Sequence, residues 1–184
     1  MSRNAPPRIS PSYLENAALH YLERFASSRA NLLRVLLRKI DRSLAHWGGE
    51  RGPAAEQAEA VIAKLAGLGY LDDAAYAAQK AANLHRRGRP ARAIRAALAA
   101  KGVTAALADG ALAELDAPDF DAAVNLARRR RLGPFRPDEA RAETRMRDLA
   151  ALARAGFDYD TARRVVDADA EILDTAAQAA TLGP

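Results

Sequence analysis

The 184-residue sequence has no cysteine, few aromatic residues and no long apolar run. The absence of cysteine excludes disulfide scaffolds, thiolate metal sites and cysteine nucleophiles. Nowhere do about 18 apolar residues occur in succession, the length that a membrane-spanning helix needs. The N-terminal residues MSRNAPPRISP contain no apolar segment of the kind found in secretory signals. We therefore expect a soluble, cytoplasmic protein.

Alanine dominates what is present, because it occupies 46 of the 184 positions. Alanine is the strongest helix former and is depleted in strands. The β-branched residues that favour strands are rare, with six Val and five Ile. This composition predicts an all-α protein.

Capping residues, prolines and glycines divide the chain into nine expected helices. Ser12, followed by Glu15, has the pattern of a capping box and predicts the start of the first helix. Ser28 is the expected cap of the second helix, and Asp72 or Asp73 that of the fourth.

The nine helices fall into three blocks of three. The expected boundaries are a disordered N-terminus (1–11), three-helix repeats over 12–71, 72–116 and 117–174, and a flexible tail (175–184). Blocks two and three share a plan, since Leu98 precedes Gly102 by four residues just as Leu152 precedes Gly156. Repeats of this kind predict an elongated array of three tandem three-helix modules.

In the third block, the expected second helix follows Pro137. Its pattern predicts that Met146, Leu149 and Leu152 point inward, with arginines on the opposite face.

The net charge of +5 is concentrated rather than spread evenly. No acidic residue occurs between Asp73 and Asp109, whereas six arginines and lysines lie between 80 and 95 and a further lysine at 101. Such a patch attracts phosphate or an acidic protein surface. A solvated helical face gives the same pattern, and the sequence leaves both interpretations open.

Arginines also recur at helical spacing on the second helix of each block, as in Arg34, Arg38 and Arg42. If the modules stack, these stripes form one discontinuous basic face for a phosphate backbone or an acidic partner. The candidate contact residues for DNA or a protein partner are Arg34, Arg38, Arg42, Arg86, Arg87, Arg89, Arg92, Arg95, Lys101, Arg128, Arg129, Arg130, Arg141 and Arg145. The run of four arginines from Arg128 is equally explained by attraction to a helix C-terminus.

No motif for catalysis, cofactor binding or metal binding is recognisable. His20, His46 and His85 are far apart in sequence, so no metal site is expected. Gly67 and Gly69 begin like a dinucleotide loop, but an aspartate stands where the third glycine belongs. The sequence predicts neither an enzyme nor a cofactor.

The central residues resemble a known family. Gly69-Tyr70-Leu71-Asp72-Asp73 is followed by Tyr76-Ala77, then Arg87-Gly88, and finally Ile94, Leu98 and Lys101-Gly102-Val103. This order resembles the central signature of the RecX regulators of the bacterial RecA recombinase. Arg154-Ala155-Gly156-Phe157 is similar to the closing repeat of that family, and the resemblance runs from Leu14 to Asp167.

The resemblance implies three tandem three-helix repeats and binding in the groove of the RecA filament on DNA. RecX proteins inhibit ATP hydrolysis, strand exchange and coprotease function by RecA, and thereby act in DNA repair and the SOS response. The implied partners are the RecA filament and single-stranded or duplex DNA, with no membrane, and the implied state is a monomer. Two other functions stay open: an independent DNA-binding protein of the helix-turn-helix type, and a structural adaptor whose arginines only keep it soluble.

Overall fold

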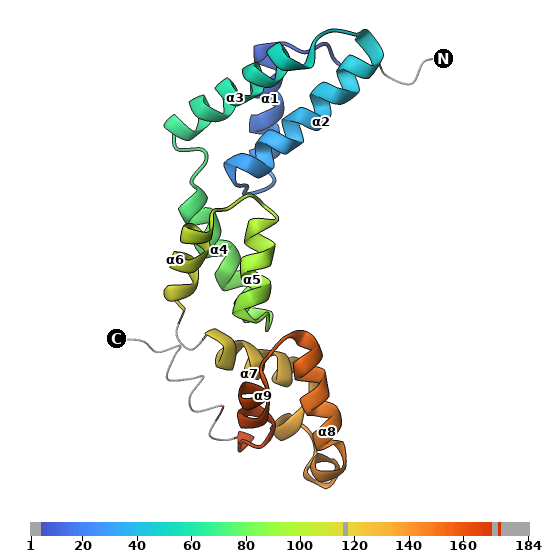
Figure 1. Ribbon diagram of the computed structural model, residues 1–184, viewed down its shortest axis with the longest axis vertical. Coiled ribbons are helices and arrows are strands. Elements are labelled where there is room, and N and C mark those ends of the chain that lie inside the picture. The colour runs from blue at the N-terminus through green and yellow to red at the C-terminus, as the bar shows by residue number, and fades with distance from the viewer. Residues whose placement is uncertain (1–4, 116–117, 171–172, 174–184) are drawn as a thin grey trace. The chain divides into compact units, whose positions relative to one another are not determined.

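A computed structural model describes residues 5–115, 118–170 and 173, and these residues form helices joined by turns (Figure 1). The α-helices are α1 Pro11–Leu22, α2 Arg29–Trp47, α3 Arg51–Gly67, α4 Asp73–Arg86, α5 Ala91–Ala99, α6 Ala105–Ala113, α7 Pro118–Arg130, α8 Asp138–Ala155 and α9 Tyr159–Val166. A 3-10 helix, η1, spans Gly133–Phe135. No strand occurs in the described residues, and the predicted all-α fold is confirmed.

The chain divides into two compact units. One contains Met1–Ala77 and Ala99–Leu107, and the other contains Ala78–Leu98 and Ala108–Pro184. The middle helices α4, α5 and α6 therefore each contribute residues to both units. The expected repeat boundaries stay predictions, and the expected tail lies outside the described residues.

In the first unit, α1, α2 and α3 pack around one apolar core (Figure 1). Leu14, Leu32, Leu36 and Ile40 are completely buried there. Ala58 on α3 is also completely buried, so this core combines leucines with small residues that allow close helix packing.

The segment before α1 lies against α2. The Trp47 indole N–H donates to the Pro6 carbonyl at 2.6 Å, and the Ser43 hydroxyl donates to the Pro7 carbonyl at 2.8 Å. The Arg8 guanidinium stands 4.5 Å from the centre of the Trp47 ring. Residues 6–8 are thus held by hydrogen bonds and a cation–π contact, although the sequence indicated a disordered N-terminus.

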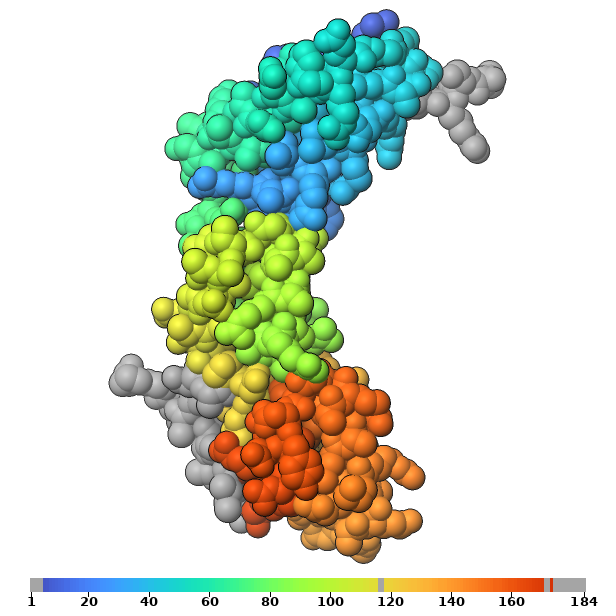
Figure 2. All heavy atoms as spheres, viewed as in Figure 1, coloured from blue at the N-terminus to red at the C-terminus, as the bar shows by residue number. Residues whose placement is uncertain are grey.

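In the second unit, α7, α8, α9 and η1 enclose a separate apolar core. Ala123, Leu152 and Val165 are completely buried in it. Figure 2 shows α8 and α9 lying next to each other on the surface of this unit.

Helix starts follow the predicted caps with one exception. The Ser28 hydroxyl accepts from the Asn31 N–H at 3.2 Å, and Asp72 accepts from two backbone N–H groups in the first turn of α4. The predicted capping box at Ser12 is wrong, because α1 begins at Pro11 and Ser10 accepts from the Tyr13 N–H. Proline is favoured in the first helical position because its missing N–H needs no partner there, which moves the cap to the residue before it.

Met146 was expected in the core, but its side chain is 71% exposed. The buried face of α8 contains Asp148, Leu149 and Leu152 instead. Because helical residues two apart differ by about 200° in direction, burial of Asp148 places Met146 on the opposite side.

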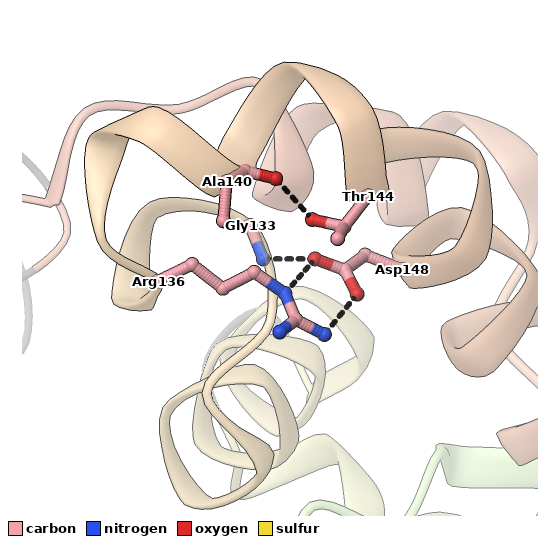
Figure 3. Close-up of polar contacts among 5 residues, drawn as sticks. All are labelled: Gly133, Arg136, Ala140, Thr144 and Asp148. Atoms are coloured by element: carbon pink, nitrogen blue, oxygen red, sulfur yellow. Dashed lines mark hydrogen bonds and ion pairs between the residues drawn. The ribbon is translucent and has the colours of Figure 1, made fainter.

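Asp148 is fully buried and holds η1 to α8 (Figure 3). Its carboxylate accepts two hydrogen bonds of 2.8 Å from the Arg136 guanidinium and one of 2.8 Å from the Gly133 N–H. Burial raises the pKa of Asp148, but these hydrogen bonds outweigh it and hold the pKa below its usual range. The carboxylate is therefore charged at neutral pH, and both of its oxygens accept hydrogen bonds.

A helix start is capped in the same way in both units. The N–H of Arg29, the first residue of α2, donates to the Asp73 carboxylate at 2.8 Å. The N–H of Ala91, the first residue of α5, donates to the Asp119 carboxylate at 2.6 Å. An aspartate at the start of a later helix thus satisfies an N–H group that the earlier helix leaves free.

The next residue of each capped helix meets a glycine. In the first unit, a Cβ added at Gly102 would collide with the Cβ of Ala30. In the second unit, a Cβ at Gly156 would lie 2.5 Å from the Arg92 guanidinium. Both glycines have positive φ, +76° and +107°. The equivalence of Gly102 and Gly156 that the sequence indicated is therefore also one of structure.

Candidate binding surface

The α2 stripe is exposed along its length, at Arg34, Arg38 and Arg42. Arg34 donates to the Ala100 carbonyl at 2.7 Å, so its guanidinium is partly occupied within the first unit. Arg38 and Arg42 form no ion pair with another described residue.

The arginines around the turn between α4 and α5 differ in their surroundings. Arg87 and Arg89 are exposed, with no ion pair to a described residue. Arg86 donates to Asn83 on its own helix. Arg95 forms an exposed ion pair of 2.6 Å with Asp109 in the second unit.

Two further members of this basic group contact their own unit. Lys101 donates to the Asn31 side chain at 3.2 Å and its carbonyl accepts from the Ser28 hydroxyl. The Arg92 side chain is exposed but stands against Gly156, as described above.

The arginines of the third block separate into two sets. Arg141 and Arg145 are half-buried: Arg141 donates to the Ala168 carbonyl at 2.9 Å, and Arg145 forms two 2.7 Å hydrogen bonds with Asp167. These contacts stabilise the packing of α8 beside α9. Arg128 lies 5.2 Å from the Phe135 ring centre and has a further interaction. Arg129 and Arg130, by contrast, are exposed at the end of α7.

Four arginines line one depression in the second unit, which we call the arginine pocket. Arg89 follows α4, and Arg129 and Arg130 belong to the last turn of α7. Arg154 belongs to the last turn of α8. The cavity volume is about 440 Å³, and no aspartate or glutamate is among the described residues that line it.

Close packing places Arg89 at this pocket. Gly88, with φ +70°, rests on α7 so tightly that an added Cβ would lie 2.7 Å from the Leu126 backbone nitrogen. Two residues after Arg89, the Ala91 N–H is held by Asp119 of α7. The backbone is therefore fixed on both sides of Arg89.

Sequence reasoning missed Arg154 as a candidate contact residue. In the sequence, Arg154 is notable only as the first residue of Arg154-Ala155-Gly156-Phe157, which is similar to the closing repeat of the RecX family. Its position two residues before Gly156 could have identified it as a candidate, because this position lies in the last turn of α8. Arg129 and Arg130 lie in the last turn of α7 in the same way.

Two other kinds of site do not occur among the described residues. In the described ranges, no group of three or more His, Asp or Glu side chains is placed to hold a metal ion. Within the same residues, no helix combines the length and the apolar character needed to cross a membrane.

The fold defines a helical repeat protein that carries exposed guanidinium groups on its surface. Residues 72–112 match the family model described as RecX, second three-helix domain. The chain is 49% identical over 167 residues to the regulatory protein RecX of Myxococcus xanthus (strain DK1622), covering 89% of each protein. It is 31% identical to the regulatory protein RecX of Agrobacterium fabrum (strain C58 / ATCC 33970), covering 84% of this chain and 82% of that relative. The chain therefore belongs to the RecX family, which confirms the resemblance seen in the sequence.

Solved structures show the same fold. A crystal structure of a regulatory protein RecX matches with a TM-score of 0.59 at 22% identity, covering 86% of this chain and 72% of the other. The crystal structure of RecX from Lactobacillus salivarius matches with a TM-score of 0.58 at 21% identity, covering 90% and 97%.

Proposed function

We propose that this protein binds the RecA filament on DNA and inhibits the recombinase, ATPase and coprotease activities of RecA. Membership of the RecX family carries the proposal, because the 49% identity to a regulatory protein RecX extends over 89% of the chain. The proposed setting is DNA repair and the SOS response in the cytoplasm, with the protein acting as a monomer.

The surface chemistry supports a binding role rather than an enzymatic one. The DNA in a RecA filament presents a phosphate group at every nucleotide. Arg38, Arg42, Arg87 and Arg89 are exposed and form no ion pair with a described residue, so these guanidinium groups are available to such a partner. Arginine binds phosphate and carboxylate through two parallel hydrogen bonds, which gives orientation as well as affinity.

The test is inhibition of ATP hydrolysis by the cognate RecA. ATP hydrolysis dependent on single-stranded DNA is followed while this protein is added to preformed filaments. We expect inhibition that rises with its concentration and saturates. Unchanged hydrolysis in the presence of excess folded protein would contradict the proposal.

A gel-shift titration without RecA examines the alternative of an independent DNA-binding protein. Salt-sensitive binding to duplex DNA with a clear sequence preference, together with no effect on RecA, would favour that alternative. We expect weak binding without sequence preference.

A further inference from the structure

We propose that the arginine pocket binds phosphoryl groups of a nucleic-acid backbone. The proposal deepens the proposed function, because the DNA of the filament is the ligand that the function supplies. It assigns DNA contact to Arg89, Arg129, Arg130 and Arg154, as distinct from arginines such as Arg95 and Arg145 that form ion pairs within the second unit.

The positive charge of the pocket exceeds what its helix ends require. The C-termini of α7 and α8, where three of the arginines lie, each carry roughly half a negative charge from the helix dipole. Four guanidinium groups therefore leave an excess of about three positive charges. No described carboxylate lines the cavity to balance them.

The four guanidinium groups have no partner among the residues that the structure describes. None of them forms a hydrogen bond or ion pair with another described residue, whereas Arg95 and Arg145 do. Each guanidinium presents five N–H donors in a planar fork that matches two oxygens of a phosphate. The pocket thus offers donors and charge to a ligand rather than to the fold.

The size and lining of the cavity indicate which anion fits. A volume of about 440 Å³ lies in the range of small-ligand sites, roughly 300–1,000 Å³, but those sites are mainly apolar. A lining dominated by arginine favours a ligand with several anionic oxygens. A protein carboxylate brings one negative charge, while a nucleic-acid strand brings one with every nucleotide and so matches the excess better.

The experiment measures binding of a fluorescein-labelled oligothymidylate by anisotropy across a series of salt concentrations. The pocket variant is Arg129→Gln/Arg154→Gln in the full chain. We expect its affinity to be at least about tenfold lower, since hydrogen bonds to charged groups contribute roughly 1.5–3 kcal/mol each. Loss of two phosphate contacts also reduces the slope of log affinity against log salt by about 1.4 for a single strand.

The matched control is Arg24→Gln/Arg131→Gly, which removes two exposed positive charges outside the pocket lining. We expect its affinity and salt slope to stay close to those of the wild type. Equal losses in both variants would overturn the proposal, because they would reflect the general field of the protein. A helical circular dichroism spectrum and a cooperative thermal unfolding transition show that each variant is folded.

A competition arm identifies the source of the phosphoryl group. ATP and inorganic phosphate are added at matched ionic strength, with sodium chloride as reference. Displacement of the oligonucleotide from the wild type by ATP beyond the chloride effect assigns the pocket to free nucleotides as well. If neither ATP nor inorganic phosphate displaces the oligonucleotide beyond the chloride effect, the ligand of the pocket is the nucleic-acid backbone.

Failure of this inference is distinguishable from failure of the proposed function. If the pocket variant binds DNA normally but no longer binds DNA-free RecA, the pocket contacts an acidic protein surface and the inference is wrong. If the wild type inhibits RecA and the pocket variant inhibits RecA and binds DNA equally well, the inference is wrong and the proposed function survives. If the pocket binds DNA but the wild type leaves RecA unaffected, the inference stands and the proposed function is wrong.

Discussion

At the scale of single residues, the buried charge of Asp148 is tolerated because both carboxylate oxygens accept hydrogen bonds and the partner is an arginine. The Asp148 side chain is 1% exposed and that of Arg136 is 25% exposed. The aspartate is therefore buried, whereas its arginine partner remains in contact with solvent. A buried carboxylate in this setting is costly to desolvate but also costly to remove, because its partners are left without an acceptor.

We predict that Asp148→Asn lowers the free energy of unfolding by about 3 kcal/mol. The amide removes the charge opposite Arg136 and replaces one acceptor oxygen with a donor. Urea denaturation measures the change. Asp138→Asn on the same helix is the control, because its side chain is 93% exposed, and we expect a change within about 0.5 kcal/mol. A similar loss in both variants would contradict the role assigned to burial.

Asp148 and two other aspartates make the stability of the protein depend on pH. The pKa values of Asp148, Asp158 and Asp167 all lie below the ordinary value; Asp158 is lowered mainly by the Thr161 N–H and Asp167 mainly by Arg145. A carboxylate with a lowered folded pKa stabilises the protein above its unfolded pKa of about 3.9, and the contribution is lost as pH falls through the folded pKa. We expect the melting temperature of the wild type to fall below about pH 4. Asp148→Asn should show a weaker fall over that range, and parallel curves would count against this assignment.

Arg131 occupies a backbone conformation that favours glycine. Its φ is +52°, and it follows the last residue of α7, where the Leu132 N–H donates to the Ala127 carbonyl at 2.9 Å. A side chain in this region costs roughly 1 kcal/mol. We predict that Arg131→Gly raises the free energy of unfolding by about 0.5–1 kcal/mol. Arg131→Ala removes the same charge but keeps the Cβ, so a gain of equal size in this variant would show that charge, not backbone strain, is responsible.

At the scale of helices, the sequence predicted the elements better than their contacts. Periodic apolar residues and the caps at Ser28 and Asp72 identified where helices lie, since both signals are local. The capping of α2 by Asp73 joins residues 44 positions apart, and no local pattern encodes it. Asp148 was missed for a related reason: its partner Arg136 lies in a turn whose path depends on η1.

The glycines that contact the capped helices α2 and α5, Gly102 and Gly156, leave no room for a side chain. We predict that Gly102→Ala lowers the free energy of unfolding by roughly 2–3 kcal/mol, because the new methyl group meets Ala30 and φ is positive. Gly110→Ala in α6 is the control, since nothing lies within 4 Å of its added Cβ. There we expect a gain of about 0.5–1 kcal/mol from higher helix propensity. Chemical denaturation of the two variants measures both effects, and equal effects would refute the close approach at Gly102.

At the scale of the whole molecule, the sequence located the basic regions but not their division of labour. The charge and the periodicity of the sequence identified fourteen basic candidates on expected helix surfaces. These patterns do not show which of the candidates contact other residues of the folded protein. Arg145 and Arg129 are indistinguishable in such a pattern. The fold separates them, because Asp167 lies beside Arg145 while Arg129 faces a cavity without a described carboxylate. Contacts within the folded protein therefore decide which arginines remain available to a partner.

The division of the arginines predicts opposite outcomes for two kinds of variant. Arg87→Glu/Arg89→Glu reverses two exposed charges that form no ion pair with a described residue, so we expect at least about tenfold weaker inhibition of RecA ATP hydrolysis with an unchanged melting temperature. Arg145→Gln breaks a half-exposed pair with Asp167, so we expect a loss of up to about 1 kcal/mol in stability and little change in inhibition. Titration of each variant against RecA filaments, with thermal unfolding in parallel, measures both quantities. Loss of inhibition by Arg145→Gln at full stability would place that arginine among the partner contacts instead.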